Sequence, residues 1–253
     1  MDEHLVFFID FLGFKEAIRD FDQARMTALL RLLRDLAALR SEFAFSESPI
    51  EGTGIQFRLK PAITTFSDHI VISFLTDHLR KIDGRDSLGT GLLLAQPLIA
   101  ALAAESMRLG ILIRGGATVG SLYHSGGVVV GEAMLEAYEL ETRVSNYPRI
   151  AVSRKIYSQT NITPRTIVLL EDGDGITHFN YFSPMITAGG QNFGDRVGTK
   201  SQMIAWLADA QQIIAKNSVH FEHQERWNEL SKWAWFKQHI EQARAALPNE
   251  LFE

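Results

Sequence analysis

The sequence predicts an α+β protein built on an antiparallel-rich sheet with helices packed on one face. Two segments read as β-hairpins, because runs of β-branched and aromatic residues are separated by turn residues. The segments around them carry apolar residues at helical spacing. The elements follow one another as strand, helix, hairpin, helix, hairpin, helix and strand, an order that a ferredoxin-like sheet accommodates.

The chain begins with a strand followed by a long helix. Residues 5–10 (LVFFID) form an apolar run typical of a central strand. Residues 14–42 carry apolar side chains at helical spacing, which predicts one long amphipathic helix. A loop rich in glycine and proline follows, and residues 55–59 form a further β-rich run.

Two hairpins and two more helices are predicted in the middle of the chain. Residues 62–74 contain ITTF and HIVISF, with Ser67 and Asp68 at the turn between them. ILIRGGATVGSLYH and GGVVVG form the second hairpin. Helices are expected at residues 88–109, ended by a glycine, and at residues 132–145.

The rest of the chain is read as short strands followed by two helices. RIAVS, IVLL and ITHFNYF read as strands, the last two on either side of an EDGDG turn. Two helices close the chain after Gly198. The second of them has an aromatic cluster that either packs on the core or forms an interface, namely Trp227, Trp233, Trp235 and Phe236.

Composition narrows the class of protein. The 253 residues include 25 Lys and Arg against 30 Asp and Glu, a net charge of -5, which argues against a nucleic-acid partner. There is no cysteine, so disulfides and cysteine zinc sites are excluded. The N-terminus has no signal-peptide pattern, and no uncharged apolar run reaches about 18 residues. We expect a cytoplasmic protein with no membrane partner.

Asp10 and Asp68 are the main candidate site residues. Asp10 ends a strand that reads as buried, and a buried carboxylate needs a partner. In the predicted topology the first strand neighbours the first hairpin, so Asp68 can approach Asp10. Two close carboxylates repel unless a cation lies between them, which suggests a divalent metal ion. Alternatively, Asp10 caps the next helix and Asp68 is a turn residue; the spacing leaves both interpretations open.

The segment after Asp10 has features of a phosphate site. Phe11, Leu12, Gly13, Phe14 and Lys15 lead from the strand into the next helix. Glycine allows close backbone approach, and a helix start presents free N–H groups.

These motifs together resemble the class III nucleotide cyclases. FIDFLGF is similar to their first metal-aspartate motif and FSDHIVISF to their second. RGGATVGSLYH, VVVGEAMLEAYELE and PRIAVS resemble the strand, hairpin, dimer-helix and strand regions that follow. Order and spacing match over about residues 4–155.

The resemblance implies a head-to-tail homodimer with active sites at the subunit interface. Asp10 and Asp68 would hold two Mn²⁺ or Mg²⁺ ions, with the Phe11 carbonyl as a third ligand, and the segment 11–15 would bind the triphosphate. We expect a catalytic domain at residues 1–185 and a helical extension at 186–253 packed on it, whose role at 199–253 is open.

The chain departs from the purine cyclases at the base and transition-state positions. Their base-reading lysine corresponds to Thr64, and their second, acidic base-reading residue to Val128, three before Gly131. Their transition-state asparagine and arginine align with Leu135 and Glu139. Glutamate has the wrong charge for stabilising a pentavalent phosphate.

Two interpretations of these losses remain open. In one, the protein cyclises a nucleotide that carries a different base, and residues near Thr64 read that base. The cation that stabilises the transition state is then Lys15, Arg114 or Arg143. In the other, it is a catalytically degenerate dimer that binds nucleotide or senses a phage component. The sequences of these motifs are similar to those of the Pycsar antiphage cyclases. This resemblance implies conversion of UTP or CTP to a cyclic monophosphate and pyrophosphate. That messenger would activate a separate effector.

Overall fold

The computed structural model describes residues 1–20, 22–42, 61–79, 87–160, 166–189 and 198–252. The chain divides into two compact units, each described by itself. The first comprises Met1–Asp10, Asp22–Leu93 and Arg114–Phe179. The second comprises Phe11–Phe21, Leu94–Ile113 and Asn180–Glu253. The expected boundary between residues 185 and 186 stays a prediction.

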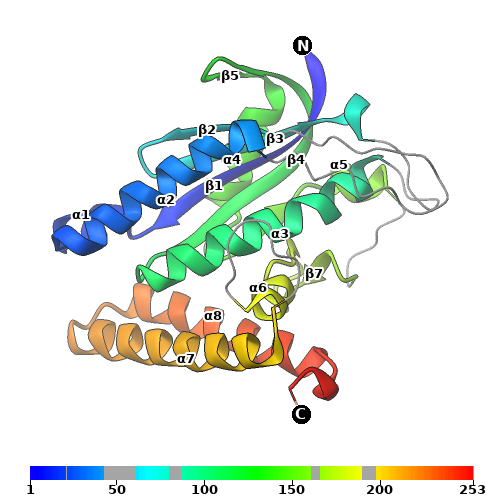
Figure 1. Ribbon diagram of the computed structural model, residues 1–253. Helices are drawn as coiled ribbons and strands as arrows, with labels where there is room; N and C mark the ends of the chain where they lie inside the picture. The colour runs from blue at the N-terminus through cyan, green and yellow to red at the C-terminus, as the bar shows by residue number, and fades with distance from the viewer. Residues whose placement is uncertain (21, 43–60, 80–86, 161–165, 190–197, 253) are drawn as a thin grey trace. The chain divides into compact units, whose positions relative to one another are not determined.

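The strands form one sheet and confirm the α+β class (Figure 1). The strands are β1 (Asp2–Leu12), β2 (Ala62–Phe66), β3 (His69–Leu75), β4 (Leu112–Ser125), β5 (Val128–Val130), β6 (Ile150–Val152), β7 (Leu169–Glu171) and β8 (Thr177–Phe179). Their order is β2-β3-β1-β4-β6-β8-β7, with β5 paired to β4. The pairs β1–β3, β2–β3, β4–β5, β6–β8 and β7–β8 are antiparallel, whereas β4–β6 is parallel.

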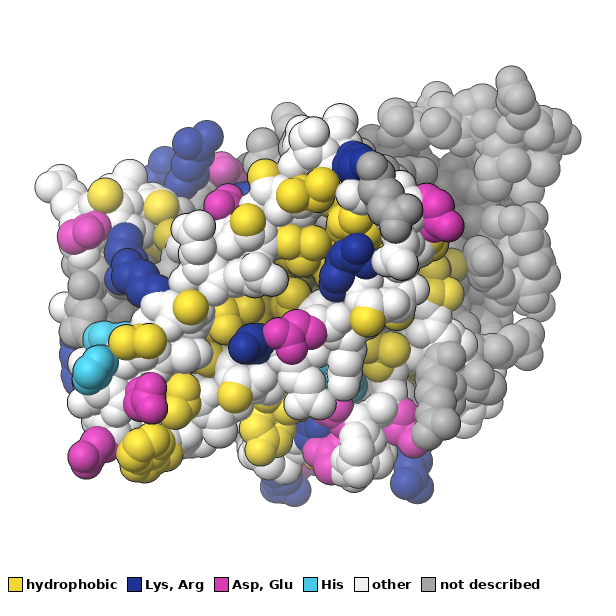
Figure 2. All heavy atoms as spheres, turned by 90° about the horizontal axis from the view of Figure 1, so that it is seen from below, with side chains coloured by type: hydrophobic (Ala, Val, Ile, Leu, Met, Phe, Trp, Pro, Cys, Tyr) yellow, Lys and Arg dark blue, Asp and Glu magenta, His cyan; other side chains and the backbone are white. Residues whose placement is uncertain are grey.

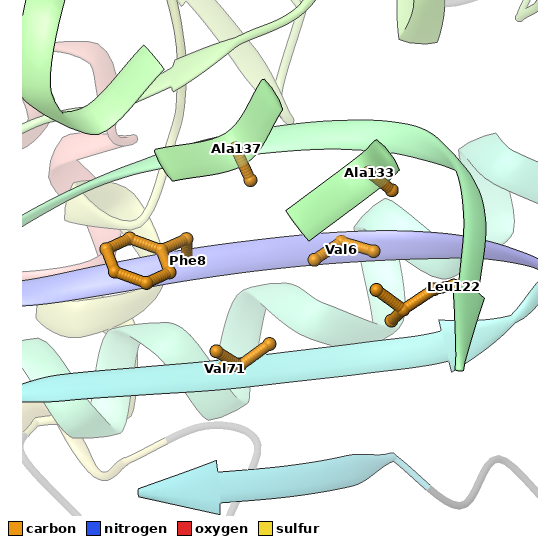
Figure 3. Close-up of a cluster of buried hydrophobic side chains, with 6 residues drawn as sticks. All are labelled: Val6, Phe8, Val71, Leu122, Ala133 and Ala137. Atoms are coloured by element: carbon orange, nitrogen blue, oxygen red, sulfur yellow. The ribbon is translucent and has the colours of Figure 1, made fainter. Parts of the chain in front are cut away.

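One face of the central strand β1 packs against α4 (Glu132–Arg143). Val6 and Phe8 on β1 point toward Ala133 and Ala137 on this helix (Figure 3). Alanines let the helix approach the sheet closely, so the two larger side chains fill the space between them. The buried cluster comprises Val6, Phe8, Val71, Leu122, Ala133 and Ala137.

The opposite face of β1 packs against the start of α3 (Ser87–Arg108). A Cβ added to Gly91 would lie 2.9 Å from Leu5 Cδ2, so helix and strand meet here at close range. Leu5 alternates with Val6 across the strand. Helices therefore cover both faces of β1, whereas the sequence predicts helices on one face.

The predicted helix at residues 14–42 is two helices, α1 (Phe14–Asp20) and α2 (Gln23–Glu42). The Asp22 carboxylate accepts a hydrogen bond of 2.8 Å from the Arg25 backbone N–H. A side chain that bonds the N–H three residues later starts a new helix. The prediction followed the apolar spacing and missed this cap.

Both predicted hairpins are present. The turn between β2 and β3 is Ser67–Asp68, and Ser67 has a φ of 55°. β4 and β5 form the second hairpin through Gly126 and Gly127, whose φ values are 60° and 83°. The predicted β-rich run at residues 55–59 lies outside the described residues.

The segment after β8 differs from the prediction. The run ITHFNYF was expected to be extended throughout, but β8 ends at Phe179 and Phe182 begins α6 (Phe182–Ala188). Aromatic residues have a high strand propensity, but here the burial of their side chains in a helix outweighs that propensity. Phe182 and Ile186 on α6 are fully buried.

The second unit contains a helical hairpin. Its long helices α7 (Lys200–His223) and α8 (Trp227–Ala246) lie side by side (Figure 1). A capping box at Thr199 and Gln202 begins α7. Trp233 and Phe236 are buried, as the packing interpretation predicts, whereas Trp227 is 61% exposed. The remaining short elements are α5 (Arg154–Ser158), η1 (Thr76–His78) and η2 (Asn249–Leu251).

One described helix is long and apolar enough to cross a membrane by length and composition, at Leu88–Arg108. The share of its most apolar window that is buried inside the protein is 72%, as for a core helix. On the face drawn in Figure 2, basic and acidic side chains of the described residues are interspersed with hydrophobic ones.

Candidate functional site

Asp10, Asp68 and His69 come together at one end of the β1–β3 pair. The antiparallel register places Asp10 directly opposite His69, and Asp68 immediately precedes His69 in the turn. Asp10 Oδ1 lies 3.6 Å from His69 Nε2, and Asp68 Oδ1 lies 3.1 Å from His69 Nδ1. Each residue offers one ligand atom, and these atoms all lie within 4.8 Å of one another. The structure thus brings the two predicted aspartates to one place.

Arg114 on β4 forms an ion pair with Asp10. Its Nε donates a 2.9 Å hydrogen bond to Asp10 Oδ2, and its Nη2 lies 2.6 Å from Glu141 Oε1 on α4. β4 reaches β1 this closely because residue 115 is glycine: a Cβ there would lie 2.3 Å from the Phe8 carbonyl oxygen. Arg114 therefore bridges two carboxylates from neighbouring elements.

The site carries more negative than positive charge. Burial raises the pKa of Glu141, and the nearby charges of Asp10 and Asp68 act in the same direction, whereas Arg114 and His69 oppose them. Three carboxylates thus share one guanidinium and one imidazole. An added cation would relieve their repulsion.

Aromatic side chains hold the His69 ring. Its centroid lies 5.1 Å from that of Phe8 and 5.5 Å from that of Phe66, the latter nearly parallel at 24°. Tyr138 on α4 meets Phe8 edge-on at 5.6 Å. All four rings belong to the first unit, and the His69 side chain is still 27% exposed. The ring is therefore oriented by packing and yet accessible.

Thr64 lies apart from the aspartates on the same face of the sheet. It pairs with Val71, two positions along β3 from His69. Its Oγ1 is 2.9 Å from His124 Nε2, and the other ring nitrogen of His124 is 2.8 Å from Ser73 Oγ. Thr64 and His124 line a pocket of about 260 Å³, together with residues 61–63 and 125–127.

The other predicted residues divide between the two units. Phe11, Leu12, Gly13, Phe14 and Lys15 belong to the second unit, where Phe11 stacks on Phe14 and Lys15 is exposed. Gly13 has a φ of 78° at the turn into α1. Their roles as metal ligand and phosphate cradle stay predictions.

The positions aligned with the transition-state pair lie on α4. Leu135 is 66% exposed, and Glu139 pairs with Arg143 over 3.5 Å on the helix surface. Arg143 is exposed, so this ion pair leaves it free to move. Arg114, the other candidate cation in this unit, is held by Asp10 and Glu141 instead.

The donor set fits a divalent metal ion. Carboxylate oxygens suit Mg²⁺, Mn²⁺ and related ions, and imidazole nitrogen suits transition metals. Asp10 is 8% exposed and lies against two partners that carry or accept positive charge. Such a buried carboxylate can hold an ion in a defined position.

Three site residues were not predicted. His69 could have been identified from the hairpin register, because residues opposite each other in an antiparallel pair share a face. Glu141 follows from helical spacing, since it lies four residues after Ala137 on the buried side of α4. Ser73 is hidden in a strand pattern, and only the fold places it against His124.

Comparison with solved structures gives several similar chains, two of which are titled as a bacterial light-regulated adenylyl cyclase. The first is 15% identical with a TM-score of 0.36, covering 83% of this chain and 98% of the other. The second is 14% identical with a TM-score of 0.37, covering 84% of this chain and 57% of the other. No protein-family model and no curated protein matches the sequence. Functional assignment therefore rests on the residues of the site.

Proposed function

We propose that the protein is a metal-dependent pyrimidine nucleotide cyclase that converts UTP or CTP to the 3′,5′-cyclic monophosphate and pyrophosphate. The observation that carries the proposal is the convergence of Asp10 on β1 and Asp68 in the β2–β3 turn on one accessible cluster with ligand atoms within 4.8 Å. The sequence motifs around both aspartates resemble those of nucleotide cyclases. UTP is favoured over CTP.

The reaction joins the ribose 3′-oxygen to the α-phosphorus, breaks the bond between that phosphorus and the bridging oxygen, and releases the 3′-hydroxyl proton. Asp10 and Asp68 would hold Mn²⁺ or Mg²⁺, two ions to a site, which supply activation of the hydroxyl and neutralisation of the phosphates. Arg114 fixes the Asp10 carboxylate through Oδ2 and leaves Oδ1 facing the cluster. Phe11 to Lys15 would bind the triphosphate.

Pyrimidine selectivity follows from the residues at the base-reading positions. Thr64 and Val128 replace the lysine and acidic residue of purine cyclases. The Thr64 hydroxyl, held by His124 at the pocket of about 260 Å³, offers a hydrogen bond to a small ring. A hydroxyl can both donate and accept, which suits uracil and cytosine alike.

A homodimer with active sites at its interface completes the proposal. Large hydrophobic side chains are exposed on β2, β4, β5 and α4 of the first unit, and such surfaces mark interaction sites. They are Phe66, Tyr123, Val128, Val130, Leu135 and Tyr138. A role in antiphage defence, with a separate effector that responds to the cyclic nucleotide, is part of the same proposal.

A second candidate function is a dimer that binds nucleotide, or senses a phage component, without turnover. It is favoured by Leu135 and Glu139, which leave the transition-state positions of α4 without a cation of their own. Both candidate functions share the fold and the metal cluster, so a measurement of product formation is needed to distinguish them.

The variant Asp68→Asn separates these candidates. It removes a charged ligand while keeping the side-chain shape, so we expect cyclic product from UTP with Mn²⁺ to fall at least about 100-fold at an unchanged melting temperature. Asp77→Asn on η1 is the matched control, because Asp77 is an exposed aspartate of the same unit. Equal product from wild type and Asp68→Asn would contradict the proposal.

A further inference from the structure

We infer that His69 is a direct ligand of the divalent ion, and that it makes the site selective for Mn²⁺ and similar transition-metal ions over Mg²⁺. The proposed function assigns the metal to Asp10 and Asp68; the inference adds a nitrogen donor to that set. The inference rests on the proposed function only for the catalytic use of the metal. Metal binding itself can be tested without it.

The spacing of the donor atoms supports the assignment. Ligands bound at about 2.1 Å to one ion lie about 3 Å apart when adjacent and about 4.2 Å apart when opposite. Asp68 Oδ1 lies 3.1 Å from His69 Nδ1, and Asp10 Oδ1 lies 3.6 Å from His69 Nε2, so each ring nitrogen has one carboxylate oxygen near it. All three donors lie within 4.8 Å of one another. An ion held by one ring nitrogen can therefore join both carboxylates once their side chains rotate toward it.

The ring of His69 is preorganised for this role. Phe8 and Phe66 restrict its plane, and the β1–β3 register fixes its backbone opposite Asp10. A ligand whose rotamer is locked by packing loses little entropy on binding. The ring keeps 27% exposure, which leaves a route for an ion from solvent.

Arg114 makes the arrangement asymmetric. It binds Asp10 through Oδ2, whereas Oδ1 of the same carboxylate faces the His69 ring. The guanidinium is also held by Glu141 through Nη2, so it need not leave when an ion binds at Oδ1. One carboxylate can thus serve both a structural ion pair and a metal.

The nitrogen donor determines the expected selectivity. Mg²⁺ prefers an octahedral set of oxygen ligands and retains its waters, whereas imidazole binds the later divalent transition metals well. Replacing His69 by an amide of similar size leaves an oxygen donor only. Affinity for Mn²⁺ should therefore fall much more than affinity for Mg²⁺.

The test measures metal binding without nucleotide. Free Mn²⁺ is followed by its electron paramagnetic resonance signal during titration of wild type, His69→Asn and the control His220→Asn, which removes an exposed histidine of α7. We expect His69→Asn to weaken Mn²⁺ binding at least about tenfold and to change Mg²⁺ competition much less, with the control unchanged.

Unchanged or tighter binding of Mn²⁺ by His69→Asn would overturn the inference. If His69 acts instead as an internal cation between Asp10 and Asp68, removing it relieves competition, and Mn²⁺ binds the variant as tightly as wild type or more tightly. An equal loss of Mn²⁺ and Mg²⁺ affinity would also contradict the inferred selectivity.

A second measurement needs no variant. Electron spin-echo modulation of Mn²⁺ bound to the wild-type protein should show coupling to a directly bound imidazole nitrogen; absence of this coupling would overturn the inference. Nitrogen coupling without cyclic product from any nucleoside triphosphate would refute the proposed function alone. Product without nitrogen coupling would refute the inference alone.

Discussion

Asp10 shows how a buried charge is stabilised in this protein. Its carboxylate is 8% exposed, and it meets Arg114 through one oxygen and His69 through the other. Leaving such a charge without partners is costly, whereas each partner here also contacts a second carboxylate. The same group is therefore both a structural anchor and a candidate ligand.

Replacing Arg114 by glutamine should destabilise the fold. Asp10 and Glu141 would lose their shared guanidinium, so we expect the free energy of unfolding to fall by about 2 kcal/mol. Urea denaturation measures this change. Arg143→Gln is the control, because its ion pair with Glu139 is exposed and should contribute little. Equal effects of the two substitutions would contradict this account.

Thr64→Val tests the base-reading position. It keeps the side-chain shape but removes the hydroxyl that contacts His124, so kcat/KM for UTP should fall about tenfold or more while ATP gains no activity. Steady-state assays with UTP, CTP and ATP check this. Thr76→Val is the control, since Thr76 on η1 hydrogen-bonds the Glu3 carbonyl of β1 rather than any pocket residue. An unchanged kcat/KM in Thr64→Val would show that Thr64 does not read the base.

Single side chains were the hardest part of the site to predict. Asp10 and Asp68 stand out because carboxylates interrupt apolar runs, and both could be found without coordinates. His69 is adjacent to Asp68 and hidden among strand residues, so its direction depends on the register of β3 against β1. Glu141 depends on the packing of α4 over the sheet.

At the level of elements, α4 is fixed to the sheet by charge as well as by its alanines. Ser153 donates a 2.7 Å hydrogen bond to Glu136 Oε1 on α4, and Lys155 Nζ lies 2.6 Å from its Oε2. Burial acts to raise the pKa of Glu136, but these two partners outweigh it and hold the pKa below its ordinary value. The network joins α4 to the start of α5.

Glu136→Gln should destabilise the protein in a pH-dependent way. A carboxyl group with a lowered pKa contributes stability above its unfolded pKa and loses that contribution as pH falls through its folded value. Near neutral pH the melting temperature should fall by no more than about 3 °C, because Lys155 is largely exposed. At about pH 3 the difference from wild type should shrink. A difference in melting temperature between wild type and Glu136→Gln that grows as the pH falls would contradict this prediction.

Elements with strong local signals were predicted well, and those decided by packing were not. The β2–β3 and β4–β5 hairpins follow from turn residues between β-forming runs. The break between α1 and α2 depends on one cap at Asp22, and α6 begins inside an aromatic run that favours a strand locally. Tertiary contacts override propensity at such places.

For the whole molecule, the sequence order predicted the α+β class, whereas the parallel β4–β6 pair depends on how a late segment returns to the sheet. The two compact units are built from interleaved segments, so no single boundary in the sequence signals them.

The most direct test incubates the purified protein with Mn²⁺ and ATP, GTP, CTP or UTP separately, then identifies products by mass spectrometry, with Asp68→Asn as the blank. The account predicts a cyclic monophosphate from UTP or CTP, neither purine product, and no product from the variant. Product from ATP or GTP alone would contradict the pyrimidine assignment made at Thr64 and Val128. No product from any nucleotide, with the fold intact, would contradict the cyclase and favour the binding dimer.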